Sequence, residues 1–151
     1  MTMKLGWVAA AAAAALCAGA DARGATTVNV RVYNFNFSAN PAGQPVLDPT
    51  IFVGDTIRWV FEQGTHTTTS VQGIPEQWHS FFQPVGGTFE HTFTHVGTWH
   101  YFCVPHGSDN GDGTASGMAG TITVVPVPAP AAGGVLALLG VRVLGRTRPR
   151  T

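Results

Sequence analysis

The sequence predicts an all-β protein built as a Greek-key β-sandwich. Short segments rich in β-branched and aromatic residues recur along the middle of the chain, several of them alternating apolar and polar positions. Glycine, proline, asparagine and aspartate separate these segments, as expected for strands joined by turns. No part of this middle region shows an apolar repeat of helical period with capping residues at its ends.

Each predicted strand is a short segment that ends at a turn signal. The first covers residues 27–37, where three valines alternate with other residues before two phenylalanines. A segment with two prolines and a glycine, residues 41–45, then interrupts the pattern. The remaining strands are predicted, in order, at residues 51–53, 56–61, 66–71, 88–94, 98–103 and 120–125.

The first 22 residues have the three parts of a secretory signal peptide. Lys4 supplies the positive charge, residues 8–16 form an alanine-rich apolar stretch, and small residues favour cleavage after Ala20 or Ala22. We therefore expect residues 1–22 to be a removable leader and the protein to be exported. Cys17 lies within this leader.

The last 26 residues, 126–151, do not suit a folded domain. A proline-punctuated linker precedes an apolar stretch over residues 131–141, which is shorter than the roughly 20 residues of a comfortable bilayer span. Four arginines follow. This order resembles the PEP-CTERM sorting tails of Gram-negative bacteria, although Val127 stands where the family has glutamate. The resemblance implies a membrane-engaging tail processed by an exosortase-type enzyme, in the periplasm or at the cell surface. A plain, weak membrane anchor is the alternative.

Residues 25–125 are enough for one domain with its own core. This region contains two arginines, no lysine and seven acidic residues, a net charge of −5 with the histidines neutral. Binding to nucleic acid rests on lysine and arginine, so this composition argues against a nucleic-acid partner. An acidic surface instead favours a basic protein partner.

One cysteine remains once the leader is removed, and its neighbours suggest metal binding. Cys103 cannot form an internal disulfide, and His106 follows three residues later. Met118, the one methionine outside the leader, lies just before the last predicted strand. Thiolate, imidazole and thioether form the ligand set of a mononuclear copper site, which also needs a second histidine. His66, after a Gly-Asp turn and an aromatic strand, is the best candidate.

Several short motifs, taken together, resemble plastocyanin- and pseudoazurin-like cupredoxins. The resemblance implies a cupredoxin-like sandwich over residues 25–125, with His66, Cys103, His106 and Met118 as ligands of one type 1 copper ion. It also implies a one-electron carrier with a basic redox partner, rather than an enzyme. The motifs are Gly54-Asp55, Trp59, His66, Gly97-Thr98-Trp99, Tyr101-Phe102-Cys103, His106 and Gly117-Met118-Ala119-Gly120.

The segment before Met118 departs from this pattern. Eleven residues, 107–117, separate Met118 from His106, where plastocyanin-like proteins have fewer. The segment is polar, and we expect a flexible loop that points outward and leaves the ligand geometry intact. Alternatively, it could admit water to the metal or weaken the bond to Met118. Its acidic residues do not have the spacing of an EF-hand calcium loop.

The other histidines and the tryptophans have simpler interpretations. His100 is expected on the surface, because alternation puts it on the strand face opposite Cys103. His91 and His95 are expected at strand ends, and His79 stays unassigned. Trp59 and Trp99 are expected in the core.

Three functions are compatible with the predicted site. Electron transfer is the leading hypothesis. The alternatives are copper storage, delivery or sensing, and a surface or matrix module without electron transfer. Enzyme activity is not expected, because no His-x-His pair exists for a multicopper cluster and no hydrolytic or phosphate-binding motif is present.

Overall fold

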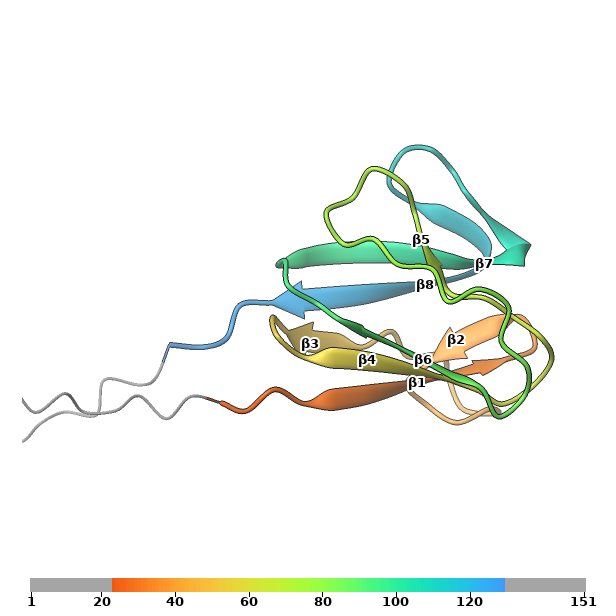
Figure 1. Ribbon diagram of the computed structural model, residues 1–151, viewed down its shortest axis with the longest axis horizontal. Helices are drawn as coiled ribbons and strands as arrows, with labels where there is room; N and C mark the ends of the chain where they lie inside the picture. The colour runs from red at the N-terminus through yellow and green to blue at the C-terminus, as the bar shows by residue number, and fades with distance from the viewer. Residues whose placement is uncertain (1–22, 130–151) are drawn as a thin grey trace, which may run out of the picture. The chain divides into compact units, whose positions relative to one another are not determined.

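Eight strands in two four-stranded sheets make up the computed structural model, which describes residues 23–129 (Figure 1). The predicted leader, 1–22, and residues 130–151 of the predicted tail lie outside the described residues. Within residues 23–129 no helix is long and apolar enough to cross a bilayer. The strands are β1 (Thr27–Tyr33), β2 (Asn36–Ser38), β3 (Thr50–Phe52), β4 (Thr56–Phe61), β5 (Thr69–Ser70), β6 (Thr88–Thr92), β7 (Gly97–Asp109) and β8 (Ala115–Val125).

The strand order confirms the predicted Greek-key sandwich. One sheet has the order β2-β1-β4-β6 and the other β3-β8-β7-β5. Both sheets are mixed, because β1 pairs with β4 and β3 pairs with β8 in parallel, whereas the other pairs are antiparallel. The chain changes sheet at every connection from β2 to β7, so neighbours in sequence face each other across the core.

The core lies between the sheets, and its largest members come from β4 and β7. In β4, Trp59 alternates with exposed or half-buried residues and is fully buried. In β7, Trp99, Tyr101 and Cys103 point inward, whereas His100 and Phe102 on the other face are half-buried. The predicted core positions of Trp59 and Trp99 are therefore confirmed. Burial of each such side chain contributes roughly 2–3 kcal/mol to stability.

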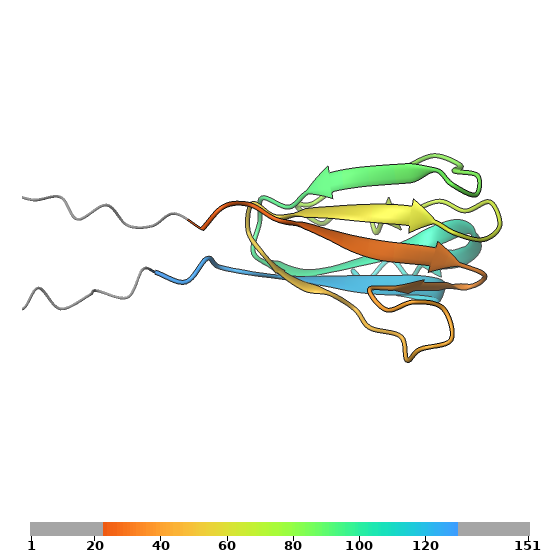
Figure 2. The same cartoon turned by 90° about the horizontal axis from the view of Figure 1, so that it is seen from below.

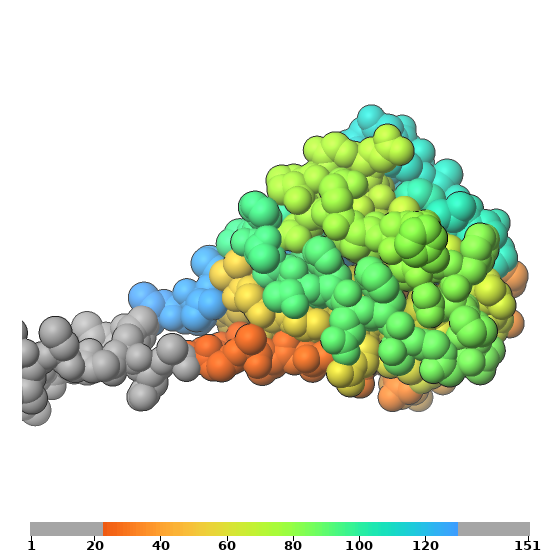
Figure 3. All heavy atoms as spheres, in the orientation of Figure 1, coloured from red at the N-terminus to blue at the C-terminus, as the bar shows by residue number. Residues whose placement is uncertain are grey.

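Two predicted strands are shorter than their sequence patterns indicate. The segment 27–37 is not one strand, because the chain turns at residues 34–35 and β2 folds back antiparallel to β1. Phe35, at this turn, has the left-handed φ of 65°, which no strand allows. Of residues 66–71, only Thr69–Ser70 belongs to a strand, and the long connection to β6 covers one face of the domain (Figure 3).

The expected loop over residues 107–117 is instead the end of a β-hairpin. Gly107, Ser108 and Asp109 pair with Gly117, Ser116 and Ala115, so β7 and β8 continue past the predicted strand ends. A backbone hydrogen bond of 3.0 Å from Asn110 N to Thr114 O closes the tip. The predicted flexible loop is therefore a paired hairpin over most of this segment.

The Gly54-Asp55 turn contacts residues near both ends of the described part of the chain. Asp55 is buried and accepts hydrogen bonds from the amides of Thr26 and Phe52 and from the guanidinium of Arg23. The Arg23 contact, opposed by burial, holds the pKa of Asp55 well below its usual range. Val53 N also donates to Val125 O at 2.9 Å, so the first and last strands meet at this pole.

Candidate metal centre

A large bulge between β7 and β8 carries half of the predicted site. Phe102 pairs with Ala119, but the next paired residues are Gly107 and Gly117. The four residues 103–106 therefore lie opposite a single residue, Met118. Cys103, His106 and Met118 are thus brought to one place by the irregular pairing of two neighbouring strands.

His66 reaches the same place from the connection that follows β4. Its amide donates to Gln83 O at 3.2 Å and its carbonyl accepts from Gln83 N at 2.8 Å, forming an isolated antiparallel bridge. The side chain is only 1% exposed. His66 therefore has little freedom to move, because its ring is buried and its backbone N–H and C=O are both hydrogen-bonded.

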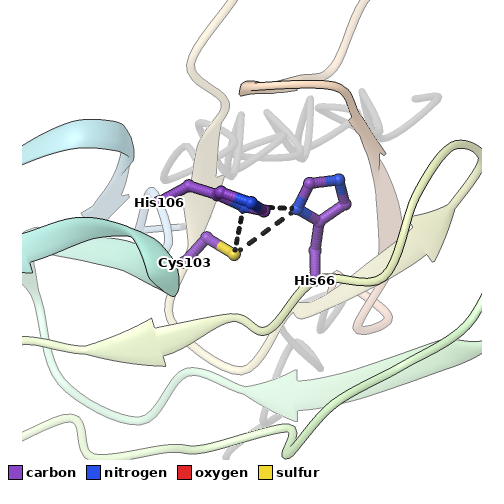
Figure 4. Close-up of side chains that lie close together, drawn as sticks. All are labelled: His66, Cys103 and His106. Carbon is purple, nitrogen blue, oxygen red and sulfur yellow. Dashed lines mark hydrogen bonds between the residues drawn. The ribbon is translucent and has the colours of Figure 1, made fainter.

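Three donor atoms converge between these segments (Figure 4). His66 Nδ1 lies 3.1 Å from His106 Nδ1, and Cys103 Sγ lies 3.5 Å from each of these nitrogens. A triangle with these sides has its centre about 2.0 Å from every corner, which is the length of a metal–imidazole bond. The side chains are therefore spaced as ligands of one metal ion.

The thiol sits in a buried, hydrogen-bonded position. Thr67 N lies 3.3 Å from Cys103 Sγ and points its hydrogen at the sulfur, while Thr67 Oγ1 accepts from Val104 N at 2.8 Å. Thr67 thus attaches the chain after His66 to the sulfur of Cys103 and to the backbone that follows it. Burial raises the pKa of the Cys103 thiol, so a metal must displace the thiol proton when it binds.

The two histidines differ in their exposure. His66 is buried, whereas His106 is exposed. Burial, together with the neighbouring His106, lowers the pKa of His66 and keeps its ring neutral, the form that can bind a metal. His106 presents the solvent-facing edge of the cluster.

Met118 is buried beside the cluster. It is 2% exposed and belongs to the same apolar core as Cys103. Its place opposite the bulge agrees with the sequence-based expectation that it returns to the pole of Cys103 and His106. The structure thus brings His66, Cys103 and His106 together and places Met118 next to them.

Sequence reasoning missed two residues at the site, Thr67 and Asn34. Thr67 directly follows His66 in the sequence, and this adjacency could have identified it as a residue of the site. Asn34 lies 3.4 Å from His66 through its side-chain oxygen, but it comes from a segment predicted as continuous strand. An asparagine in such a segment is a turn signal that the alternating pattern concealed.

The remaining histidines lie outside the cluster. His91 Nε2 and His95 Nδ1 each lie 2.9 Å from a carboxylate oxygen of the buried Glu76. His100 is half-buried beside Thr121, which makes it less exposed than predicted. His79 contacts Thr69 and the ring of Phe81.

A soft thiolate with two imidazoles is a donor set suited to copper. Zinc also accepts these donors, but its structural sites have four ligands in a tetrahedron. Here the cluster has three donors, and the buried Met118 lies opposite the bulge that carries two of them.

Comparisons with known proteins agree with this architecture. No family model matches the chain. Similar solved structures include a reduced amicyanin mutant, 21% identical with a TM-score of 0.49 over 69% of this chain and 85% of that one. An oxidized amicyanin mutant is 22% identical with a TM-score of 0.47, over 65% and 81%. The copper-containing nitrite reductase of Thermus scotoductus is 21% identical with a TM-score of 0.50, over 68% of this chain and 23% of that one.

The strand order and the likeness to the nitrite reductase define a class of fold. The described residues form a cupredoxin-type β-sandwich, as the strand order and the likeness to the nitrite reductase domain show. At its bulged pole this sandwich carries the cluster of His66, Cys103 and His106.

Proposed function

We propose that this chain is an exported type 1 copper protein that carries single electrons. The observation that carries the proposal is the triangle of His66 Nδ1, Cys103 Sγ and His106 Nδ1, whose centre is about 2.0 Å from each atom, close to the length of a metal–imidazole bond. Copper would supply the one-electron change between Cu(I) and Cu(II). The similar nitrite reductase is itself a copper-containing protein.

The chain's part in electron transfer is to hold the ligands still. His66 is fixed by its bridge to Gln83, and Cys103 by the contacts of Thr67 with its sulfur and with the amide of the next residue. Ligands held by such hydrogen bonds cannot rearrange much when the charge of the metal changes. Little reorganisation between the two oxidation states is what rapid electron exchange needs.

Met118 would be the weak axial ligand. It is the residue opposite the bulge, and its flexible, polarisable thioether suits a long bond to copper. In this proposal the paired hairpin 107–117 fixes Met118 against the bulge, so the length of the insertion does not detach the ligand.

Electrons would enter and leave at the exposed edge of His106. Phe35 packs against this ring, with centroids 5.1 Å apart, and both Phe35 and Val104 are exposed apolar residues. An apolar rim of this kind lets a partner approach closely and exclude water. Phe102, half-buried next to Cys103, offers a second route.

We propose a basic protein as the redox partner. All three arginines among residues 23–129 are paired with acidic residues, in the salt bridges Arg23–Asp55, Arg31–Glu62 and Arg58–Glu90. The hairpin that continues from the bulge carries Asp109 and Asp112, which make no salt bridge within the described residues. The surface charge is therefore negative, and a basic partner would be steered towards it.

The location follows from the two ends of the sequence. We propose export through the leader 1–22, and engagement of the membrane by the tail 126–151 with processing by an exosortase-type enzyme. Mass spectrometry of the protein recovered from the cell envelope tests both steps. An N-terminus at Asp21 or Arg23 supports removal of the leader, and a retained Met1 contradicts it.

The spectrum of the copper-loaded full chain tests the proposed function. A type 1 site gives an intense visible absorption from thiolate-to-copper charge transfer, together with an EPR signal of unusually small copper hyperfine splitting. Rapid, reversible one-electron oxidation at an electrode would complete the case. A chain that binds Cu(II) but stays colourless would contradict the proposal.

Copper delivery is the second candidate, and the exposure of His106 favours it, because an exposed ligand can be replaced by an incoming one. Competition with a Cu(I) chelator separates the two functions. Metal loss within seconds, with slow electron exchange, supports delivery. Slow metal loss with fast electron exchange supports the carrier.

A further inference from the structure

The turn between β1 and β2 touches both histidines of the cluster. Asn34 Oδ1 lies 3.4 Å from His66 Nε2, and the ring of Phe35 meets the ring of His106 edge to face. Asn34 and Phe35 are consecutive residues that follow β1, whereas His66 comes from the connection after β4 and His106 from the bulge of β7. A single turn therefore contacts the outer side of both imidazoles.

The chemistry of His66 requires an acceptor where Asn34 lies. His66 Nδ1 faces Cys103 Sγ, so this nitrogen is the one that offers a lone pair to a metal. A neutral imidazole that binds through Nδ1 keeps its hydrogen on Nε2. The His66 ring is buried, and an N–H without an acceptor there would cost about 1–3 kcal/mol. Asn34 Oδ1 lies within reach of this nitrogen, and the backbone carbonyl of Gln63 is a second acceptor for the His66 ring.

Gly64 supplies the space for this contact. A Cβ at Gly64 would lie 2.6 Å from His66 Nε2 and 2.7 Å from Asn34 Oδ1, closer than atoms can approach. Its φ of +66° is also one that other residues rarely adopt. The backbone at residue 64 is thus pressed against the Asn34–His66 contact, and any side chain there would separate the two groups.

Phe35 also adopts an unfavourable conformation next to the cluster. It has a left-handed φ of 65°, which is uncommon for a bulky residue, and it is 62% exposed. Burial of the side chain therefore does not explain this conformation. The contact with His106 is the interaction that the turn provides, and residues held in such conformations concentrate at functional sites.

We infer that Asn34, Phe35 and Gly64 are positioning residues of the metal centre. Asn34 fixes the tautomer and ring plane of His66, Gly64 leaves room for that contact, and Phe35 restricts the ring of His106. The inference rests on the proposed function only in taking the cluster as a metal site. It assigns the β1–β2 turn to that site, although the turn supplies no ligand.

NMR of the full chain loaded with Zn²⁺ or Cu(I), both diamagnetic, tests the role of Asn34. We expect His66 to carry its proton on Nε2, and this proton to exchange slowly with solvent. In Asn34→Leu the exchange should accelerate at least tenfold, and Cu(I) affinity in a chelator competition should fall about 10- to 100-fold. Asn34→Asp, which keeps an acceptor oxygen, should retain slow exchange.

Asn36→Leu is the matched control, since Asn36 is exposed two residues away and makes no side-chain hydrogen bond within the described residues. It should leave both measurements unchanged. The inference is overturned if Asn34→Leu behaves like Asn36→Leu, or if His66 of the unaltered protein carries its proton on Nδ1. The second result is measured on the unaltered protein, so it can overturn the inference even if Asn34→Leu folds poorly.

Phe35→Gly tests the other half of the turn. Glycine accepts the left-handed φ, so the backbone should keep its shape. We expect the His106 signals to broaden and Cu(I) to be lost at least threefold faster to a chelator. Unchanged signals and exchange rates would overturn the role of Phe35.

The same samples separate this inference from the proposed function. If the unaltered chain loaded with Cu(II) lacks intense visible absorption, the type 1 assignment fails whatever the variants do. If that absorption is present and Asn34→Leu changes neither proton exchange nor affinity, the inference alone fails.

Discussion

Cys103 combines two properties that a copper thiolate needs, a donor atom aimed at two imidazoles and protection from other chemistry. The side chain is fully buried, and its sulfur accepts a hydrogen bond from Thr67 N. Such a thiol is slow to oxidise or to be alkylated, because it is neither exposed nor ionised. The sulfur is therefore available chiefly to a metal ion that binds between His66 and His106.

Replacement of this sulfur gives the most direct prediction. Cys103→Ser keeps the size of the side chain and an acceptor for Thr67 N, so the fold should persist. The intense visible absorption of the Cu(II) protein should disappear, because a hydroxyl has no low-energy charge transfer to copper. Absorption and circular dichroism spectra measure the two effects. A coloured Cys103→Ser protein would show that the thiol is not the ligand.

Met118→Leu tests the fourth ligand. The two side chains have similar volume, so the loss of stability should stay below about 1.5 kcal/mol. Without the thioether, Cu(II) has one donor fewer and is less stabilised than Cu(I), so the reduction potential should rise. Voltammetry measures this potential, and the visible absorption should remain. An unchanged potential would mean that Met118 only fills the core.

Among the connecting segments, the one from β5 to β6 is held by a buried carboxylate. Glu76 is 3% exposed and accepts hydrogen bonds from the backbone of Thr94 and His95, with His91 and His95 at its oxygens. These contacts outweigh burial, which alone would raise the pKa, and they lower the pKa of Glu76 to about 2. Trp78, two residues further on, stacks on His91 and Trp59.

This carboxylate makes stability depend on pH in a defined range. The pKa of Glu76 is lower in the folded chain than the ordinary 4.5, so its contribution is present above about pH 4.5 and is lost as pH falls towards 2. The contribution should be up to about 3 kcal/mol at neutral pH. In Glu76→Gln the free energy of unfolding should be lower at pH 7, and its fall between pH 4.5 and 2 correspondingly smaller.

Urea unfolding of the metal-free protein as a function of pH measures this difference. Glu90→Gln is the control, because Glu90 forms an exposed salt bridge with Arg58 and should contribute less than about 1 kcal/mol. If Glu76→Gln and Glu90→Gln lose equal stability at pH 7, the Glu76 contacts do not hold the segment.

The comparison of sequence with structure shows which features a local pattern can reveal. Alternation predicted β4 and β7 and the inward face of Cys103, because burial follows a period of two in a strand. The hairpin 107–117 was missed, since its glycines and aspartates resemble an unpaired loop. The contacts of Glu76 with residues 91–95, and of Asn34 with His66, join distant segments of chain. No local pattern carries information about such pairs.

The domain has two dissimilar poles. The Asp55 turn, the beginning of β1 and the end of β8 meet at one pole (Figure 2). The β1–β2 turn and the bulge with Cys103 and His106 lie at the other ends of these strands. The chain therefore enters and leaves the domain far from the candidate metal centre, and attachments at either end need not cover it.

Removal of residues 130–151 should therefore leave the centre unaltered. We expect the shortened chain to show the absorption maximum, reduction potential and Cu(I) affinity of the full chain, while its recovery in the membrane fraction falls. Spectroscopy of the soluble protein and cell fractionation measure these effects. A shifted absorption maximum would mean that the tail contacts the metal centre.

The distribution of charge gives a last prediction, about encounters with a partner. Asp112 is fully exposed on the hairpin tip, where Thr114 N and Oγ1 donate to its carboxylate and lower its pKa, so it is charged at neutral pH. Asp112→Asn removes one negative charge and keeps an acceptor for Thr114. If a basic partner approaches the pole of His106, this change should slow association about two- to fivefold at low salt.

Glu90→Gln removes the same charge from β6 in the other sheet, where Arg58 pairs with it. It should slow association with a basic redox protein less than Asp112→Asn does. Stopped-flow electron transfer at several salt concentrations measures both rates, which should converge with the unaltered protein as salt screens the charges. Equal effects of the two variants would mean that only net charge matters, and that the hairpin does not orient the partner.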